Sequence, residues 1–350
     1  MEERVGKYSI ITTGEFEIEK SDVLMLDSNL LIDIDKFYYM GISRPTRESL
    51  RELLYRARNI REIDFYVALR ETCIKRENRD LLHAKRMIHA AKMVWDKSDG
   101  ARERMFANRH PPVKRDKRWQ KGKISVEEGG MVPEGLPEGF WLFYGSFLHL
   151  IMLYEQIGAR QREELFVQHC QWTRNELSCV AAYPRMVARS LLLGKAEESN
   201  RARALLKVDK KNIPIEDKAW NAAWDCYFMS ILDGYRMGSG NVVGEMRRRN
   251  PMKVALATAK DQAWIDSISS YRGALWMGDM CIPFVENMSG VREDAMAVAE
   301  EQAQKDNIVI AMRLGDEHKI KTACEAISNL ESDLGIAHPV GLQLEVESFL

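Results

Sequence analysis

The clearest pattern in the chain is a hydrophobic run that ends abruptly in an acid. Residues 23–26 read Val-Leu-Met-Leu, Asp27 follows them directly, and Asn29 comes two positions later. A continuous apolar run of this length is typical of a strand buried on both faces of a parallel sheet. Because ligands of open α/β sheets bind outside the carboxyl ends of the strands, we predict that Asp27 lies at such an edge.

The rest of the pattern predicts few strands and many helices. Residues 252–258 are predicted to form a second buried strand, residues 307–312 a third, and weak alternation in the first 20 residues predicts an edge strand. Apolar residues recur at helical spacing in the segments 45–58, 63–76, 80–95, 140–157, 161–180, 184–195, 217–237, 293–304 and 317–330. This pattern indicates an α/β fold with a small parallel sheet flanked by helices.

A shift in composition predicts how the 350 residues are divided. The segment 108–139 combines prolines and glycines with a basic cluster, which indicates a loop or an inserted segment. We therefore predict a discontinuous α/β core made of residues 1–96 and 216–315. Residues 97–215 would form a mostly helical insertion, and residues 316–350 a C-terminal helix and tail.

Charge and cysteine content narrow the class of protein. The chain has 51 basic and 52 acidic residues, so a nucleic acid would have to bind at a local patch. Six cysteines form no C-x-x-C pair and have no histidine at zinc-ligand spacing, which predicts buried, reduced thiols in a cytoplasmic protein. No apolar run is long enough to span a bilayer, so we expect no membrane association.

Three more acids are candidates to join Asp27 in one site. Glu71 lies in a predicted helix, Asp225 interrupts an apolar helix, and Asp261 follows the strand predicted at 252–258. An acid in so apolar a helix is costly to bury unless it is paired or bound to a metal.

Each of these acids also has a plain structural explanation. Asp27 could begin a turn, and Glu71 could pair with neighbouring arginines on the surface. Asp225 could hydrogen-bond a buried backbone group or an arginine, and Asp261 could cap a helix.

Together, these residues resemble the PIN-domain family of nucleases. The resemblance rests on the D-x-N pattern of Asp27 and Asn29, and on the segments 68–71 (Ala-Leu-Arg-Glu), 224–225 (Trp-Asp) and 256–261 (Leu-Ala-Thr-Ala-Lys-Asp). Two features depart from the family. Its last acid usually comes two residues after the threonine or serine, where this chain has Lys260, so Asp266 is an alternative to Asp261. The gap between the second and third acids also requires a large insertion.

The resemblance implies a metal-dependent endoribonuclease, with a toxin or phage-defence effector as its biological setting. One or two Mg²⁺ or Mn²⁺ ions would be held by the catalytic carboxylates Asp27, Glu71, Asp225 and Asp261. Asn29 and Thr258 would orient these carboxylates or their waters. The main alternative is a non-catalytic helical interaction protein that keeps the PIN-like sheet. The shifted position of the last acid favours this alternative. A metal-dependent phosphatase or DNA nuclease is a weaker alternative.

Two local basic clusters are candidates to bind single-stranded RNA. The first surrounds a tryptophan, and the second precedes the strand predicted at 252–258. The residues are Lys114, Arg115, Lys117, Arg118 and Trp119 in the first cluster and Arg247, Arg248 and Arg249 in the second. Cations contact phosphates and an aromatic ring stacks on a base, although a solvated loop would also explain either cluster. A protein inhibitor or regulator and the oligomeric state stay open.

Overall fold

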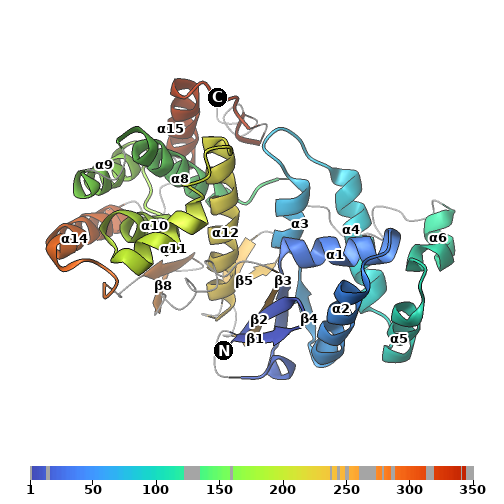
Figure 1. The fold of residues 1–350 in the computed structure, drawn as a ribbon. Coiled ribbons are helices and arrows are strands. Elements are labelled where there is room, and N and C mark those ends of the chain that lie inside the picture. The colour runs from blue at the N-terminus through green and yellow to red at the C-terminus, as the bar shows by residue number, and fades with distance from the viewer. Residues whose placement is uncertain are drawn as a thin grey trace. The chain divides into compact units, whose positions relative to one another are not determined.

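The computed structural model shows a chain whose contacts divide it into two units, which are described one at a time (Figure 1). Unit 1 comprises Met1–Leu136, Gly234–Ser239 and Arg249–Asp261, and unit 2 comprises Pro137–Asp233, Gly240–Arg248 and Gln262–Leu350. The structure describes residues 2–12, 16–121, 135–157, 161–236, 239–242, 245–248, 252–259, 273–277, 280–284, 288–312, 319–339 and 341–343.

Unit 1 is built on a five-stranded mixed sheet with the strand order β1-β2-β7-β3-β4. The strands are β1 (Glu2–Val5), β2 (Tyr8–Thr12), β3 (Val23–Leu26), β4 (Glu62–Asp64) and β7 (Val254–Thr258). Strands β7, β3 and β4 are parallel, whereas β2 runs antiparallel to both β1 and β7. The predicted α/β class is confirmed, and the sheet is mixed because β1 and β2 form a hairpin. Its tight turn contains Gly6 at φ 59°, a conformation that glycine adopts without strain.

Strands β3 and β7 confirm the two apolar runs that the sequence singled out. Every residue of both strands is buried, and they pair in parallel from Val23–Val254 to Leu26–Ala257. The helices of unit 1 are α1 (Ser28–Tyr39), α2 (Arg44–Arg56), α3 (Tyr66–Cys73), α4 (Leu81–Trp95), α5 (Asp99–Ala107) and the short α6 (Lys117–Gln120). The helix predicted at 63–76 is shorter than expected, because residues 62–64 pair with β3 as the strand β4.

The core of unit 1 explains why α5 belongs to it. Helix α1 buries Leu30, Ile34 and Phe37, one apolar stripe at helical spacing. Phe37 stacks on Phe106 of α5 with ring centroids 4.4 Å apart. Helices α5 and α6 fall within the segment 97–215 that was predicted as an insertion, yet they belong to unit 1, whose first segment runs to Leu136.

Unit 2 consists mainly of helices. They are α8 (Glu138–Ile157), α9 (Arg162–Asn175), α10 (Ala182–Leu193), α11 (Ala196–Leu206), α12 (Ile215–Arg236, whose last turn belongs to unit 1), α14 (Met296–Met312) and α15 (Lys319–Asp333). Two ribbons are formed by β5 (Ser239–Val242) with β6 (Glu245–Arg248) and by β8 (Gly273–Met277) with β9 (Met280–Phe284). Among the described helices, none has the length and apolar composition that crossing a bilayer requires.

The strand predicted at 307–312 is wrong, because α14 continues as a helix to Met312. A buried strand would hide its β-branched residues, yet the side chain of Ile308 is 59% exposed. Asp306, which directly precedes this run, has its carboxylate buried against arginines from two other helices.

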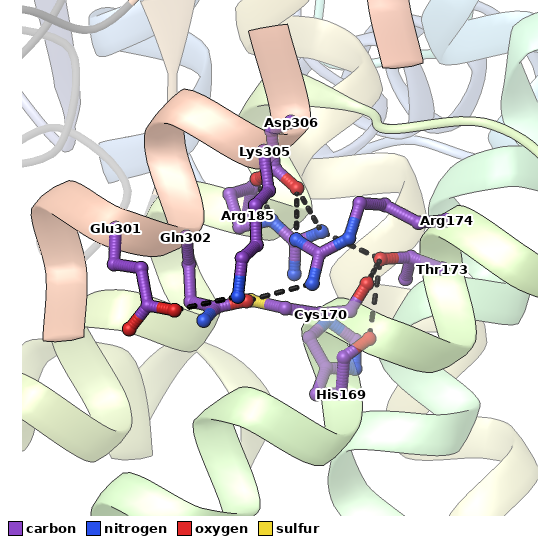
Figure 2. Close-up of polar contacts among 9 residues, drawn as sticks. All are labelled: His169, Cys170, Thr173, Arg174, Arg185, Glu301, Gln302, Lys305 and Asp306. Atoms are coloured by element: carbon purple, nitrogen blue, oxygen red, sulfur yellow. Dashed lines mark hydrogen bonds and ion pairs between the residues drawn. The ribbon is translucent and has the colours of Figure 1, made fainter. Parts of the chain in front are cut away.

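A polar network joins α9, α10 and α14 inside unit 2 (Figure 2). Asp306 accepts hydrogen bonds of 2.7 Å from the Nη1 atom of Arg174 and from the Nε atom of Arg185. The Nη2 atom of Arg174 donates to Gln302 at 2.7 Å, and that of Arg185 donates to Thr173 at 2.6 Å. One carboxylate from α14 therefore holds two guanidinium groups from neighbouring helices.

Candidate site at the carboxyl ends of the parallel strands

Three polar side chains reach the same edge of the sheet in unit 1. Asp27 directly follows β3, Asp64 is the last residue of β4 and Thr258 is the last residue of β7. Asp64 lies beside Met25 in the register, and side chains alternate along a strand, so these three polar residues belong to the same face. All three are buried.

Asp27 connects two strands and a helix. Its Oδ1 atom accepts a hydrogen bond of 2.7 Å from the N–H of Leu30, which caps α1. Its Oδ2 atom accepts from the hydroxyl of Thr258 at 2.6 Å and from the N–H of Ala259 at 3.0 Å. The main-chain N–H of Asp27 in turn donates to the carbonyl oxygen of Ala257 at 3.0 Å. The structure thus brings together the predicted pair of Asp27 and Thr258, and it also gives Asp27 a structural role as a helix cap.

Asp64 is a residue of this edge that the sequence reasoning missed. Its carboxylate accepts from the main-chain N–H of Tyr66 at 2.9 Å and from the hydroxyl of Tyr235 at 2.8 Å. Burial raises the pKa of Asp64, and these two hydrogen bonds and the charge of Arg70 offset part of that rise. The available signal was an acid at the end of the Glu-Ile-Asp segment, but a three-residue strand is too short to show a pattern.

The structure places the other predicted site residues on several different elements. Glu71 is half-buried on α3, and Asn29 is exposed in the first turn of α1. Asp225 is half-buried on α12 in unit 2, whereas Asp261 and its alternative Asp266 lie outside the described residues.

The oxygen atoms at this edge of the sheet meet only part of what a Mg²⁺ or Mn²⁺ site requires. Carboxylate and hydroxyl oxygens are the ligands that Mg²⁺ and Mn²⁺ prefer. However, within the described stretches no three His, Cys, Asp or Glu side chains lie close enough together to hold a metal ion. The five described cysteines are free thiols, and four of them are buried, as the sequence predicted.

The first basic cluster is well defined in unit 1. Lys114 and Arg115 lie in the 3₁₀ turn η3 (Pro112–Arg115), Lys117 and Arg118 lie in α6, and all four side chains are exposed. The backbone of Trp119 belongs to α6, but its side chain is outside the described part. In the second cluster, Arg247 and Arg248 contribute backbone to β6, while their side chains and all of Arg249 are outside it.

Comparisons of the chain with protein-family models, with curated proteins and with solved structures gave no match.

Proposed function

We propose that the chain is a metal-dependent endoribonuclease of the PIN-like type, with its reacting centre at the carboxyl edge of β7, β3 and β4. The observation that carries the proposal is the hydrogen bond between Thr258 and Asp27, which joins the ends of two parallel strands that are 231 residues apart in sequence. Open α/β sheets bind their ligands at this edge. Asp64, on the neighbouring strand, adds a second buried carboxyl group to the same face.

The chain's own residues would prepare this edge for chemistry. Three donors fix the orientation of the Asp27 carboxylate, and such pre-organisation lowers the cost of positioning a reacting group. Because burial raises its pKa, Asp64 holds a proton more readily than an exposed aspartate would.

Further carboxylates would complete the site. Glu71 lies on the helix that follows Asp64, and it would supply a further oxygen ligand together with Asp261. A bound Mg²⁺ or Mn²⁺ ion contributes Lewis-acid chemistry to phosphodiester hydrolysis. The exposed cations of η3 and α6 would contact the phosphates of a single-stranded RNA.

The proposal is tested by cleavage of a labelled single-stranded RNA in the presence of Mg²⁺ or Mn²⁺. Wild-type protein should cleave it, and Glu71→Gln should lose most activity, because glutamine keeps the shape of the side chain but not its charge. Glu77→Gln is the matched control: Glu77 is an exposed acid just beyond α3, and its loss should leave cleavage unchanged. Wild-type protein that shows neither cleavage nor a metal-dependent rise in melting temperature would rule out the nuclease.

A second candidate function is a non-catalytic interaction protein that keeps this sheet. It is favoured by the three hydrogen bonds to Asp27, which account for the burial of that carboxylate without any bound metal. This candidate predicts an Asp27 variant with altered stability and no activity to lose.

A further inference from the structure

A cavity in unit 1 is lined by cations that pair with no acid in the part of the chain that the structure describes. It has a volume of about 290 Å³ and lies between α4, α5 and η3. Lys97 follows α4, Arg104 belongs to α5 and Arg115 ends η3, so three separate elements each bring one cation to the wall. None of the three forms an ion pair with a carboxylate among the described residues. Such a concentration of like charge favours an anionic ligand.

Asp116, the acid in the described lining of this cavity, already accepts hydrogen bonds from other residues of the protein. Asp116 is 9% exposed, and its Oδ2 atom accepts a 2.5 Å hydrogen bond from the hydroxyl of Tyr38. The Nε2 atom of His89 lies 3.0 Å from the same oxygen, and the main-chain N–H of Arg118 donates to Oδ1 at 3.0 Å. Asp116 therefore helps to hold η3 and α6 against α1, and the three cations are left to face the cavity.

A neighbouring cavity shows that arginines lining a cavity in this unit do not always lack carboxylate partners. That cavity, of about 410 Å³, lies between α2 and α5 and is also lined by arginines. There, however, Arg51 pairs with Glu103 and Arg102 pairs with Asp99. The cations of the smaller cavity are thus distinguished by their lack of carboxylate partners.

The remaining walls of the smaller cavity are suited to a base or a sugar. Met93, Met105 and Pro112 supply apolar surface, and Asn108 and His110 add polar groups. Apolar walls with a few polar groups are typical of small-molecule sites, and the volume lies near the lower end of their range, about 300 Å³. A lining that combines cations with apolar surface matches a ligand that joins a phosphate to a flat ring.

We propose that this cavity binds a nucleotide through its phosphate group, presented either by a free mononucleotide or by the 5′-phosphorylated end of an RNA chain. Lys97, Arg104 and Arg115 contact the phosphate, and the methionines pack against the base. The exposed Lys114 and Lys117 flank the lining residues Arg115 and Asp116 in the sequence and would contact the phosphates of an RNA chain. This site does not depend on the nuclease activity proposed above.

The test is direct binding to the full chain by titration calorimetry, with no cleavage readout. Adenosine 5′-monophosphate should bind, adenosine should not, and inorganic phosphate should bind more weakly than the nucleotide. Two short RNAs of the same sequence, with and without a 5′-phosphate, distinguish the two sources: binding of the phosphorylated RNA alone assigns the cavity to an RNA end. If neither the nucleotide nor the phosphorylated RNA binds, or if phosphate binds as tightly as the nucleotide, the proposal is overturned.

Matched variants locate the site. Arg115→Gln should weaken binding about tenfold or more, since it removes a charge-assisted contact. Arg109→Gln removes the same charge from an exposed arginine outside the lining, and it should change affinity by less than about twofold. Ala101→Leu fills the cavity without changing its charge and should also weaken binding. Equal losses in Arg115→Gln and Arg109→Gln would show general electrostatic attraction in place of a defined site.

Discussion

At the scale of single residues, Asp27 shows how a candidate catalytic acid can also be a structural element. Its carboxylate accepts from the N–H of Leu30, the hydroxyl of Thr258 and the N–H of Ala259. A clustered set of acids would repel one another, so that neutralising one would raise stability. The three donors around Asp27 predict the opposite effect on stability, because each of them needs an acceptor.

Asp27→Asn should therefore lower the melting temperature. An asparagine offers one acceptor oxygen and one NH₂ group, so the N–H of Ala259 would face another donor. A buried donor left without an acceptor costs about 1–3 kcal/mol. Chemical denaturation of Asp27→Asn beside Asp96→Asn, an exposed aspartate at the end of α4, measures the effect, and the control should stay near wild type. A rise in stability would instead indicate repulsion within a carboxylate cluster.

The residues of this edge differ in how visible they were in the sequence. Asp27 and Thr258 end long buried runs, so an apolar pattern pointed to each of them. Asp64 ends a strand of only three residues, and the partner of its carboxylate, Tyr235, is 171 residues away. The pairing of Asp116 was also not visible in the sequence, because its partner Tyr38 comes from a different element, the helix α1. Pairings of this kind depend on the tertiary fold and leave no local pattern.

Two buried histidines predict that unit 2 is sensitive to acid. His149 and His169 lie with their Nδ1 atoms 3.2 Å apart, and burial lowers the pKa of His149 to about 3. An unfolded histidine titrates near pH 6.5. Between these two values the unfolded chain binds more protons than the folded chain, so stability falls as the pH drops below about 6.5.

For His149 alone, this loss should amount to about 2 kcal/mol between pH 6.5 and pH 5. His149→Phe keeps a ring to stack on Trp172, which lies 4.3 Å from the histidine ring, and should make the melting temperature less dependent on pH in this range. His110→Phe replaces an exposed histidine in the same way and serves as the matched control. Parallel pH profiles for wild type and His149→Phe would contradict the assignment.

At the scale of elements, the apolar runs predicted where a secondary-structure element lies better than whether it is a strand or a helix. The runs at 23–26 and 252–258 became strands because both their faces are covered in the middle of a sheet. The run at 307–312 is equally apolar but became the last turns of α14. A short apolar run does not distinguish a strand from a helix, and here the run continues a helix that begins at Met296.

The network around Asp306 is predicted to be essential for the packing of α14. Asp306→Asn would remove the charge that pairs with the buried Arg174 and the half-buried Arg185, and breaking a buried ion pair in this way costs about 3–5 kcal/mol. The pair of Glu301 and Lys305, also drawn in Figure 2, lies on the same helix but is exposed to solvent. Glu301→Gln should therefore leave the melting temperature unchanged. Thermal unfolding of both variants tests this contrast, and similar melting temperatures would show that the buried network contributes little.

At the scale of the whole molecule, the sheet of unit 1 depends on a strand from far along the chain. β7 lies between β2 and β3 and pairs with both, antiparallel to the first and parallel to the second. The sequence predicted a discontinuous core from the composition shift at 108–139 and from the long gap between Glu71 and Asp225. The boundaries of that core were not predictable, since the contact of Phe106 with Phe37 that retains α5 is not visible in any local pattern.

A chain that ends at residue 136 should therefore fail to fold. It keeps β1–β4 and α1–α6 but lacks β7, so the β1–β2 hairpin and the β3–β4 pair lose the strand that joins them. The loss also removes the acceptor carbonyl of Ala257 and the donors that hold Asp27. Circular dichroism should show no cooperative thermal transition for residues 1–136. Joining residues 234–261 to this chain through a Gly/Ser linker restores β7 and Tyr235, and a cooperative transition should return. Cooperative unfolding of residues 1–136 alone would show that the two halves of the sheet are stable without their central strand.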